Sequence, residues 1–249
     1  MTAFQTNLNH SSCSDKITEV DANLTVVQLS STHNVCVAHE ECRQYGERMG
    51  LYMFLIGRHF TRLPDECIAG EKDVWTSLND LLINSGTSKT GWKDADPRDP
   101  LFASSDNSFN WLEGQPGGNE HAVGLEKKSR KIHDIPMLWR GNPHQIVCQM
   151  AWSVSTSHPI MVLSQFRSDY PSVIRELISQ STTEDSCYES FTSTTAIECA
   201  KKCYLNAYCR SSYFHNDSNT CISMLYVDAK VPSKFAQLIG PWKRYARTA

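Results

Sequence analysis

The chain has 249 residues, which allows one large domain or two modest ones. Its 24 Lys and Arg residues against 27 Asp and Glu residues give a formal net charge of -3, so nothing in the composition points to nucleic acid or to an anionic membrane as a partner. A content of 40% hydrophobic and 10% aromatic residues is typical of a folded globular protein and excludes a disordered one.

The ten cysteines are even in number and fall into two sets. They are Cys13, Cys36, Cys42, Cys67 and Cys148, then Cys187, Cys199, Cys203, Cys209 and Cys221. This pattern is typical of a disulfide framework in an oxidising compartment and therefore indicates an extracellular protein. Sequons at Asn9, Asn23 and Asn216 are glycosylation candidates that agree with secretion.

The first residues lack the basic region and apolar run of a secretory signal, so we expect that the true amino terminus is missing. No apolar run approaches the length that spans a bilayer, and we expect no membrane insertion.

The beginning of the chain predicts a strand followed by a helix. Residues Asn23 to Leu29 are β-branched and partly alternating, which favours a strand. Capping side chains at residues 31–34 precede a helical pattern that Gly50 closes. The residues at helical spacing are Val35, Ala38, Cys42, Tyr45 and Met49. Cys42 is therefore expected to face the core.

The middle of the chain is dominated by loop signals. Residues Asp96 to Asn110 are rich in Pro, Asp and Ser and predict a loop. Between Trp111 and Cys148, turn formers and polar side chains lead into an apolar run that ends in the cysteine. This order predicts a long surface loop that returns into a core strand.

The last third predicts a connection and a small module. Residues 153–184 form the connection, in which Pro171 starts a short helix with apolar residues on one face: Val173, Ile174, Leu177 and Ile178. From residue 185 onward, Thr194 and Thr195 precede a helix that carries Cys199 and Cys203 one turn apart. An aromatic strand at Tyr213 and Phe214, a polar turn at 216–219 and a strand with Cys221 follow.

Residues 13–152, which follow a tail of residues 1–12, resemble a C-type lectin-like domain, an α+β fold. The matching landmarks are Trp75 to Asp80, Gly91 to Asp94, Asn110-Trp111, Gly114 to Gly117, Glu120 to Val123, Ile132 to Asp134 with Met137, and Cys148-Gln149. The resemblance implies a strand at Gly91 to Asp94 and a bridge between Cys42 and Cys148. A bridge that closes a loop of about a hundred residues stabilises a domain by roughly 4 to 5 kcal/mol.

The same resemblance implies a ligand-binding loop with Trp111, Gln115, Glu120, His133 and Asp134 as site residues. At the calcium-ligand positions of the sugar-binding members, Gln115, Glu120 and Asp134 keep an oxygen, whereas Gly117 and His133 do not. Because calcium takes six to eight oxygen ligands, we expect weak calcium binding at best, and the alternative is that the three are solvated loop residues. Gln115 would favour galactose-type ligands. The family's second bridge is absent, because Ala122 and Met137 occupy its positions.

Residues 185–249 are similar to a PAN/apple domain, a small α+β module stapled by disulfides. The similarity implies the bridges Cys199–Cys221 and Cys203–Cys209 and a last strand around Trp242 to Tyr245. Cys13, Cys36, Cys67 and Cys187 remain and allow three pairings. One of them, between the amino-terminal segment and Cys187, would fix the two domains relative to each other.

The sequence favours a binding protein over an enzyme. A zinc site at Cys199, Cys203, Cys209 and His215 would lack paired CxxC elements. No phosphate loop, serine elbow or cysteine-nucleophile signature occurs. We expect His39, His121, His144 and His215 at the surface or in caps. The first hypothesis is recognition of a glycan or glycoprotein by the loop around residues 111–134; the alternative is a calcium-independent adhesion protein that binds a protein partner.

Overall fold

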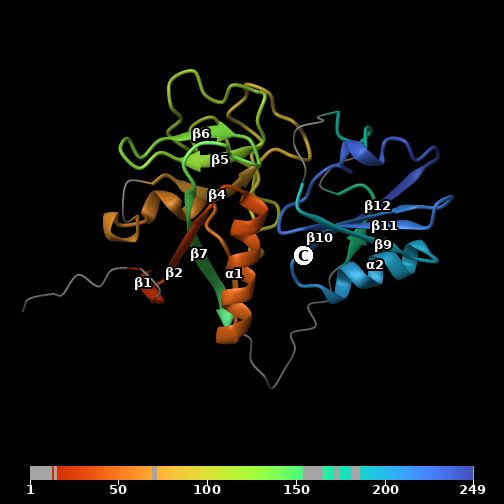
Figure 1. Ribbon diagram of the computed structural model, residues 1–249, viewed down its shortest axis with the longest axis horizontal. Helices are drawn as coiled ribbons and strands as arrows, with labels where there is room; N and C mark the ends of the chain where they lie inside the picture. The colour runs from red at the N-terminus through yellow and green to blue at the C-terminus, as the bar shows by residue number, and fades with distance from the viewer. Residues whose placement is uncertain are drawn as a thin grey trace, which may run out of the picture.

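The computed structural model describes residues 13, 16–68, 72–153, 165–170, 174–180 and 186–248. These residues form two α+β domains that lie side by side, each with one β-sheet and one α-helix (Figure 1). The candidate glycosylation site at Asn9 and the tail of residues 1–12 lie outside the described residues. Asn23 and Asn216 are exposed, each in the turn between two strands.

In the sheet of the first domain, the strand that comes last in the sequence lies in the interior of the sheet. Its strands in spatial order are β1 (Thr18–Asp21), β2 (Leu24–Thr32), β7 (His144–Ser153), β4 (Val74–Asn79), β5 (Ala122–Leu125) and β6 (Ile132–Ile135), while β3 (Leu51–Leu55) also pairs with β7. Strand β2 confirms the prediction for Asn23 to Leu29. All six residues of β4 are buried, as expected for a core segment.

Helix α1 (Val35–Met49) begins and ends where its caps predict. The side chain of Asn34 accepts hydrogen bonds from the backbone N–H groups of Cys36 and Val37, and Gly50 ends the helix in the left-handed conformation with φ 67. Cys42 faces the core and is bonded to Cys148 in β7, as the resemblance implied. Met49 is 52% exposed, so the apolar stripe of the helix ends before it.

The connection between β4 and β5, residues 80–121, contains no strand and is stabilised by its own buried aromatic side chains. The prediction of a strand at Gly91 to Asp94 is wrong, because only an isolated bridge joins Asn79 and Lys93. Trp92 is fully buried, and its ring lies 5.1 Å from that of Trp111. Two short 3-10 turns are η1 (Arg58–Arg62) and η2 (Asp65–Cys67). Their buried residues belong to the same hydrophobic cluster as Trp92 and Trp111. We name residues 80–121 the long loop.

The second domain is a sheet with a helix on one face. Its strands in spatial order are β8 (Phe166–Arg167), β12 (Trp242–Arg247), β10 (Cys209–His215), β11 (Thr220–Leu225) and β9 (Tyr188–Thr192), with α2 (Ala196–Leu205) beside them and a 3-10 turn, η3 (Ser233–Phe235). Strand β8 lies in the segment that the sequence assigned to the connection. The described residues 174–180 form a bridge from Ile178 to Val231 and no helix, while Pro171 and Val173 lie outside the described residues.

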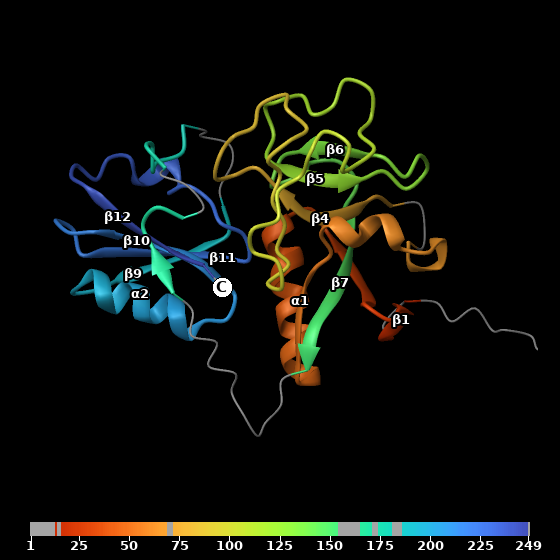
Figure 2. The ribbon, with the colours of Figure 1, turned by 180° about the vertical axis from the view of Figure 1, so that it is seen from behind.

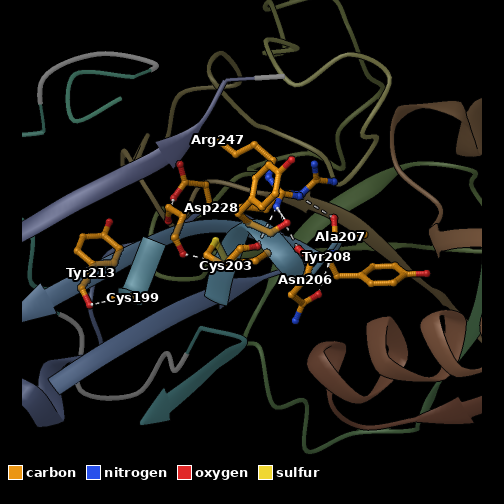
Figure 3. Close-up of a disulfide and its surroundings, with 12 residues drawn as sticks. Cys199, Cys203, Asn206, Ala207, Tyr208, Tyr213, Asp228 and Arg247 are labelled. Carbon is orange, nitrogen blue, oxygen red and sulfur yellow. Dashed lines mark hydrogen bonds between the residues drawn. A yellow bond between two sulfur atoms is a disulfide. The ribbon is translucent and has the colours of Figure 1, made fainter. Parts of the chain in front are cut away.

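Disulfides staple α2 to the strands beneath it. The bridges Cys199–Cys221 and Cys203–Cys209 are the two that the PAN/apple similarity implied. Because these cysteines are oxidised, they cannot form the alternative zinc site with His215. The guanidinium of Arg247 in β12 donates to the carbonyls of Cys203, Tyr204, Asn206 and Ala207 at the end of α2 (Figure 3).

The remaining cysteines pair as Cys13–Cys67 and Cys36–Cys187. The second bridge joins α1 to the second domain, so the expected inter-domain bridge exists and starts from the helix. Both ribbon views show α1 on the side of the first domain that faces the second (Figures 1 and 2). The rings of Tyr52 and Tyr208 stack across this junction with centroids 4.4 Å apart. One hydrophobic cluster therefore runs through both domains.

Candidate functional site

The long loop closes over the carboxylate of Asp134, which lies in β6 and is 2% exposed. The backbone N–H of Gly117 donates to Oδ1 and Oδ2 of Asp134, each at 2.9 Å, and the N–H of Gly118 donates to Oδ2 at 3.1 Å. Gln115 Oε1 also accepts from the Gly117 N–H at 3.0 Å. The oxygens retained at Asp134 and Gln115 are thus engaged by backbone amide groups of the loop.

Those residues do not fit a calcium ion as they are arranged. Amide hydrogens at the Asp134 oxygens occupy the directions in which a cation would bind and carry the wrong partial charge for it. Calcium also takes six to eight oxygen ligands, and the side chains of Gln115, Glu120 and Asp134 offer only a few of them. The half-buried Glu120 lies close enough to Asp134 for burial and that like charge to raise the pKa of Glu120.

A buried hydrogen bond anchors both ends of the long loop. His121 Nδ1 donates to Oδ1 of Asp80 at 2.7 Å, and Oδ2 of the same carboxylate accepts from the N–H of Ser85 at 2.6 Å. Asp80 follows β4 and His121 precedes β5, so the pair joins the first and last residues of the loop. This contact holds the loop ends together beside the core.

Trp111 packs in the hydrophobic core of the first domain. It is 7% exposed, packs against Trp92 and forms an isolated bridge with Ile132 of β6. Its side chain fills the hydrophobic core beneath the loop, and its role as a ligand-binding residue stays a prediction.

His133 does not join the other predicted site residues. Successive residues of a strand point to opposite faces of the sheet, and His133 precedes Asp134 in β6. Its imidazole instead lies beside two other groups: the imidazole of His144, at the start of β7, and the carboxylate of Asp73, which precedes β4. The sequence alone did not show this cluster, since its three members are far apart in the chain and meet only through strand pairing.

Four histidines that we expected at the surface are buried. They are His39, His121, His144 and His215, with exposed fractions of 2%, 8%, 2% and 1%. Each is covered by a neighbour that sequence spacing does not reveal: His39 stacks on Tyr226 of the second domain, and the rings of Trp75 and His144 lie 4.8 Å apart. Local polarity was a poor guide because a neutral imidazole packs as an aromatic ring.

A cavity of about 580 Å³ lies at the junction of the two domains. It is lined by α1 and by the second domain, through Glu40, Arg43, Glu47, Glu189, Leu205, Asn206, Ala207, Tyr208, Leu225 and Tyr226. The hydrogen bond from Arg43 lowers the pKa of Glu40 to about 2, so this carboxylate is ionised at neutral pH. The hydroxyl of Tyr226 donates to the same carboxylate.

Among the described residues, none of the helices has the length and apolar character needed to cross a membrane.

Comparison with known proteins gives similarity in fold only. No family model and no curated protein sequence matches the chain. Among solved structures, the C-type lectin CEL-I from Cucumaria echinata is 13% identical, with 53% of this chain and 94% of that chain covered and a TM-score of 0.39. Human lithostathine is 16% identical, with 54% and 96% covered and a TM-score of 0.39.

A calcium-dependent type II antifreeze protein, in its calcium-free form, is 15% identical, with 53% and 94% covered and a TM-score of 0.39. About half of the chain is thus similar in fold to C-type lectin domains and related solved structures. At these identities the likeness assigns no ligand to this chain.

Proposed function

We propose that the chain is an extracellular, non-enzymatic binding protein whose long loop contacts a protein or glycoprotein partner without calcium. The observation that carries this proposal is the engagement of Asp134 by the N–H groups of Gly117 and Gly118. The oxygens that would hold a cation instead fix the shape of the loop. A loop fixed in this way is suited to present a contact surface.

The outer surface of the long loop has the composition of a contact surface. Residues 87–90 of the loop are exposed and read Thr-Ser-Lys-Thr, and two apolar side chains of the loop are exposed as well. These are Ile83, 47% exposed, and Leu101, 62% exposed. Polar and adaptable side chains around a few apolar anchors are typical of protein contact surfaces, and the buried Trp92 and Trp111 give this surface a firm base.

The five disulfides support an extracellular location, because they use all ten cysteines and require an oxidising compartment. The similarity of the second domain to a PAN/apple module stays a prediction.

Glycan recognition with weakly bound calcium is a second candidate, and one observation favours it. Glu120 and Asp134 are like charges close to each other, and a cation between them would remove the repulsion that raises the pKa of Glu120. In that case the loop would have to open so that Asp134 exchanges its amide partners for the ion. The galactose-type preference implied by Gln115 belongs to this candidate.

The two candidates differ in their response to a chelator. The folded, oxidised chain is screened against a glycan array and a panel of extracellular proteins, with calcium and again with a chelator. We expect binding to a protein or glycoprotein that the chelator does not change. Leu101→Asp and Ile83→Asp should each weaken it at least about tenfold, as loss of an interface anchor does.

The control variant is Ile239→Asp, which places the same change at a 90% exposed residue of the second domain and should leave binding intact. Glycan binding that the chelator abolishes would contradict the proposal and support the second candidate. Binding that persists in both loop variants would show that the long loop is not the contact surface.

A further inference from the structure

Three metal-ligating side chains meet on the face of the first sheet opposite to Asp134. They are Asp73, ahead of β4, His133 in β6 and His144 at the start of β7. One ligand atom of each lies within 4.8 Å of the others. Asp73 and His133 are half-buried and His144 is buried.

Both imidazoles present a nitrogen that has no partner. Nδ1 of His133 and Nε2 of His144 are buried and make no hydrogen bond. Nδ1 of His144 lies 3.2 Å from the carbonyl oxygen of Asn142, which can only accept, so Nδ1 carries the proton and Nε2 offers its lone pair. A backbone carbonyl that fixes the tautomer in this way is typical of metal-bound histidine. A buried polar atom without a partner is costly, and a bound ion would remove that cost.

Gly124 of β5 lets the backbone approach both rings closely. It pairs with His133, and a Cβ atom at Gly124 would lie 3.0 Å from Cδ1 of Ile135, 3.1 Å from Nε2 of His144 and 3.4 Å from Cε1 of His133. A side chain at residue 124 would therefore crowd both imidazoles and the free Nε2 of His144. Gly124 has no positive φ that would require a glycine for the backbone.

The carboxylate of Asp73 is held in place from two sides. Its Oδ1 accepts from the backbone N–H of Lys127 at 3.1 Å, and its backbone carbonyl accepts from the N–H of Gln145 at 2.7 Å, next to His144. The donor set is two imidazoles, each with a free nitrogen, and one carboxylate.

We infer that Asp73, His133 and His144 form a binding site for Zn²⁺, with a fourth position open to water. Two imidazoles with a carboxylate suit zinc, whereas the hard cations calcium and magnesium take oxygen ligands. A tetrahedral zinc ion with bonds of about 2.0 to 2.1 Å places its ligand atoms about 3.4 Å apart. The ligand atoms lie within 4.8 Å of one another, so ion binding requires side-chain rotations that bring them closer. The site is distinct from the long-loop surface and does not depend on the proposed function.

The test uses the full oxidised chain, stripped of metal with a chelator and titrated with Zn²⁺ in a calorimeter. We expect one zinc ion per chain and a higher melting temperature in its presence. Co²⁺ in the same site should give the visible absorption of a tetrahedral complex. Quenching of tryptophan fluorescence by Co²⁺ offers a further signal, because the rings of Trp75 and Trp139 lie 4.8 and 5.8 Å from that of His144.

The variants separate this site from incidental histidine binding. His133→Ala and Asp73→Asn change half-buried ligands and should weaken zinc binding at least about 100-fold, since loss of a group that only orients a metal ligand already costs about 10- to 100-fold. Gly124→Ala keeps all three ligands but places a methyl group 3.1 Å from Nε2 of His144 and should also abolish the cobalt spectrum. His59→Ala is the matched control, because it removes another half-buried histidine that lies outside the cluster. Melting in chelator verifies that each variant is folded.

Absence of zinc binding to the wild-type chain at micromolar concentrations would overturn the inference. It would also fail if folded His133→Ala and Asp73→Asn variants bound zinc as tightly as the wild type, since the ion would then be held elsewhere.

Discussion

His39 shows how a single buried titratable group ties folding to pH. It lies in α1, faces the second domain and is 2% exposed. Its ring stacks on that of Tyr226 with centroids 5.0 Å apart, and its Nδ1 has no hydrogen-bond partner. Burial, with a smaller contribution from the charge of Arg210, lowers the pKa of His39 to about 3 from 6.5. The unfolded chain therefore binds a proton at His39 that the folded chain excludes. Stability due to this group is complete above pH 6.5 and is lost as the pH falls toward 3.

We expect His39→Phe to reduce acid sensitivity. The phenyl ring keeps the stacking on Tyr226 and cannot be protonated. Between pH 7 and pH 4.5 the wild type should lose about 2 to 3 kcal/mol of unfolding free energy more than the variant. Denaturant titration at both values measures the difference. Burial raises the pKa of Asp94 to about 6, which acts in the opposite direction, so only comparison with the variant isolates His39. Equal pH dependence in both proteins would contradict this account.

Gly117 is one of two positions, with His133, at which the side-chain oxygen of a calcium ligand is missing. A Cβ atom there would lie 3.8 Å from Oδ2 of Asp134 and 3.8 Å from Oε1 of Gln115, which is ordinary contact, so the position tolerates a side chain. Gly117→Asp adds a third carboxylate beside Glu120 and Asp134. We expect the variant to be less stable than the wild type without calcium and to regain stability in millimolar calcium, as measured by thermal melting.

Gly117→Asn is the matched control for charge and should respond less to calcium. An equal calcium response in the wild type and Gly117→Asp would mean that the loop already holds the ion, contrary to the proposed function.

At the scale of elements, α2 depends on contacts from outside itself. A helix of ten residues is marginal in isolation, and its last carbonyls have no partners within the helix. Arg247 supplies these partners from the neighbouring β12, at 2.8 Å to the carbonyl of Cys203 and 2.9 Å to that of Tyr204 (Figure 3). Its fork geometry serves several oxygens at once.

We therefore expect Arg247→Ala to destabilise the second domain by about 1.5 to 3 kcal/mol, as loss of a charged hydrogen-bonding group does. Arg247→Lys should recover only part of this, because a single ammonium cannot reach all the carbonyls. Hydrogen exchange of the α2 amides together with denaturant titration measures the loss. Arg167→Ala, which removes an exposed arginine paired with Asp169, is the control and should have little effect. Unchanged exchange rates in Arg247→Ala would refute this role.

The same scale explains what the sequence could reveal. Helix α1 was predictable because Asn34 and Gly50 act on backbone groups within one turn, and the three bridges Cys42–Cys148, Cys199–Cys221 and Cys203–Cys209 followed from family spacing. In contrast, the face that His133 takes depends on the pairing of β5 with β6, and the burial of His39 depends on the other domain. The family resemblance implied a strand at Gly91 to Asp94, but this segment forms only an isolated bridge, between Asn79 and Lys93.

At the scale of the whole molecule, the two domains share one core. The bridge Cys36–Cys187, the stacking of Tyr52 on Tyr208 and the donation from Arg210 to the carbonyl of Ala95 join them. These contacts differ in kind, so loss of one leaves the others. Because one hydrophobic cluster and a disulfide bridge span the junction, we expect the two domains to unfold together.

We expect the oxidised wild type to unfold in a single transition. The double variant Cys36→Ser with Cys187→Ser should lose about 4 kcal/mol or less, because the bridge Cys42–Cys148 already shortens the loop that Cys36–Cys187 closes. Tryptophan fluorescence and circular dichroism during denaturation measure both. Two separated transitions in the wild type would show that the domains are energetically independent.

The order of strands bears on how the protein is made. Strand β7 lies between β2 and β4, and β12 lies between β8 and β10, so each sheet receives an inner strand last in sequence. On a ribosome, the earlier strands of each domain emerge with unpaired edges and must wait for that strand. Each domain is therefore expected to need protection by chaperones during translation until its final inner strand has left the exit tunnel.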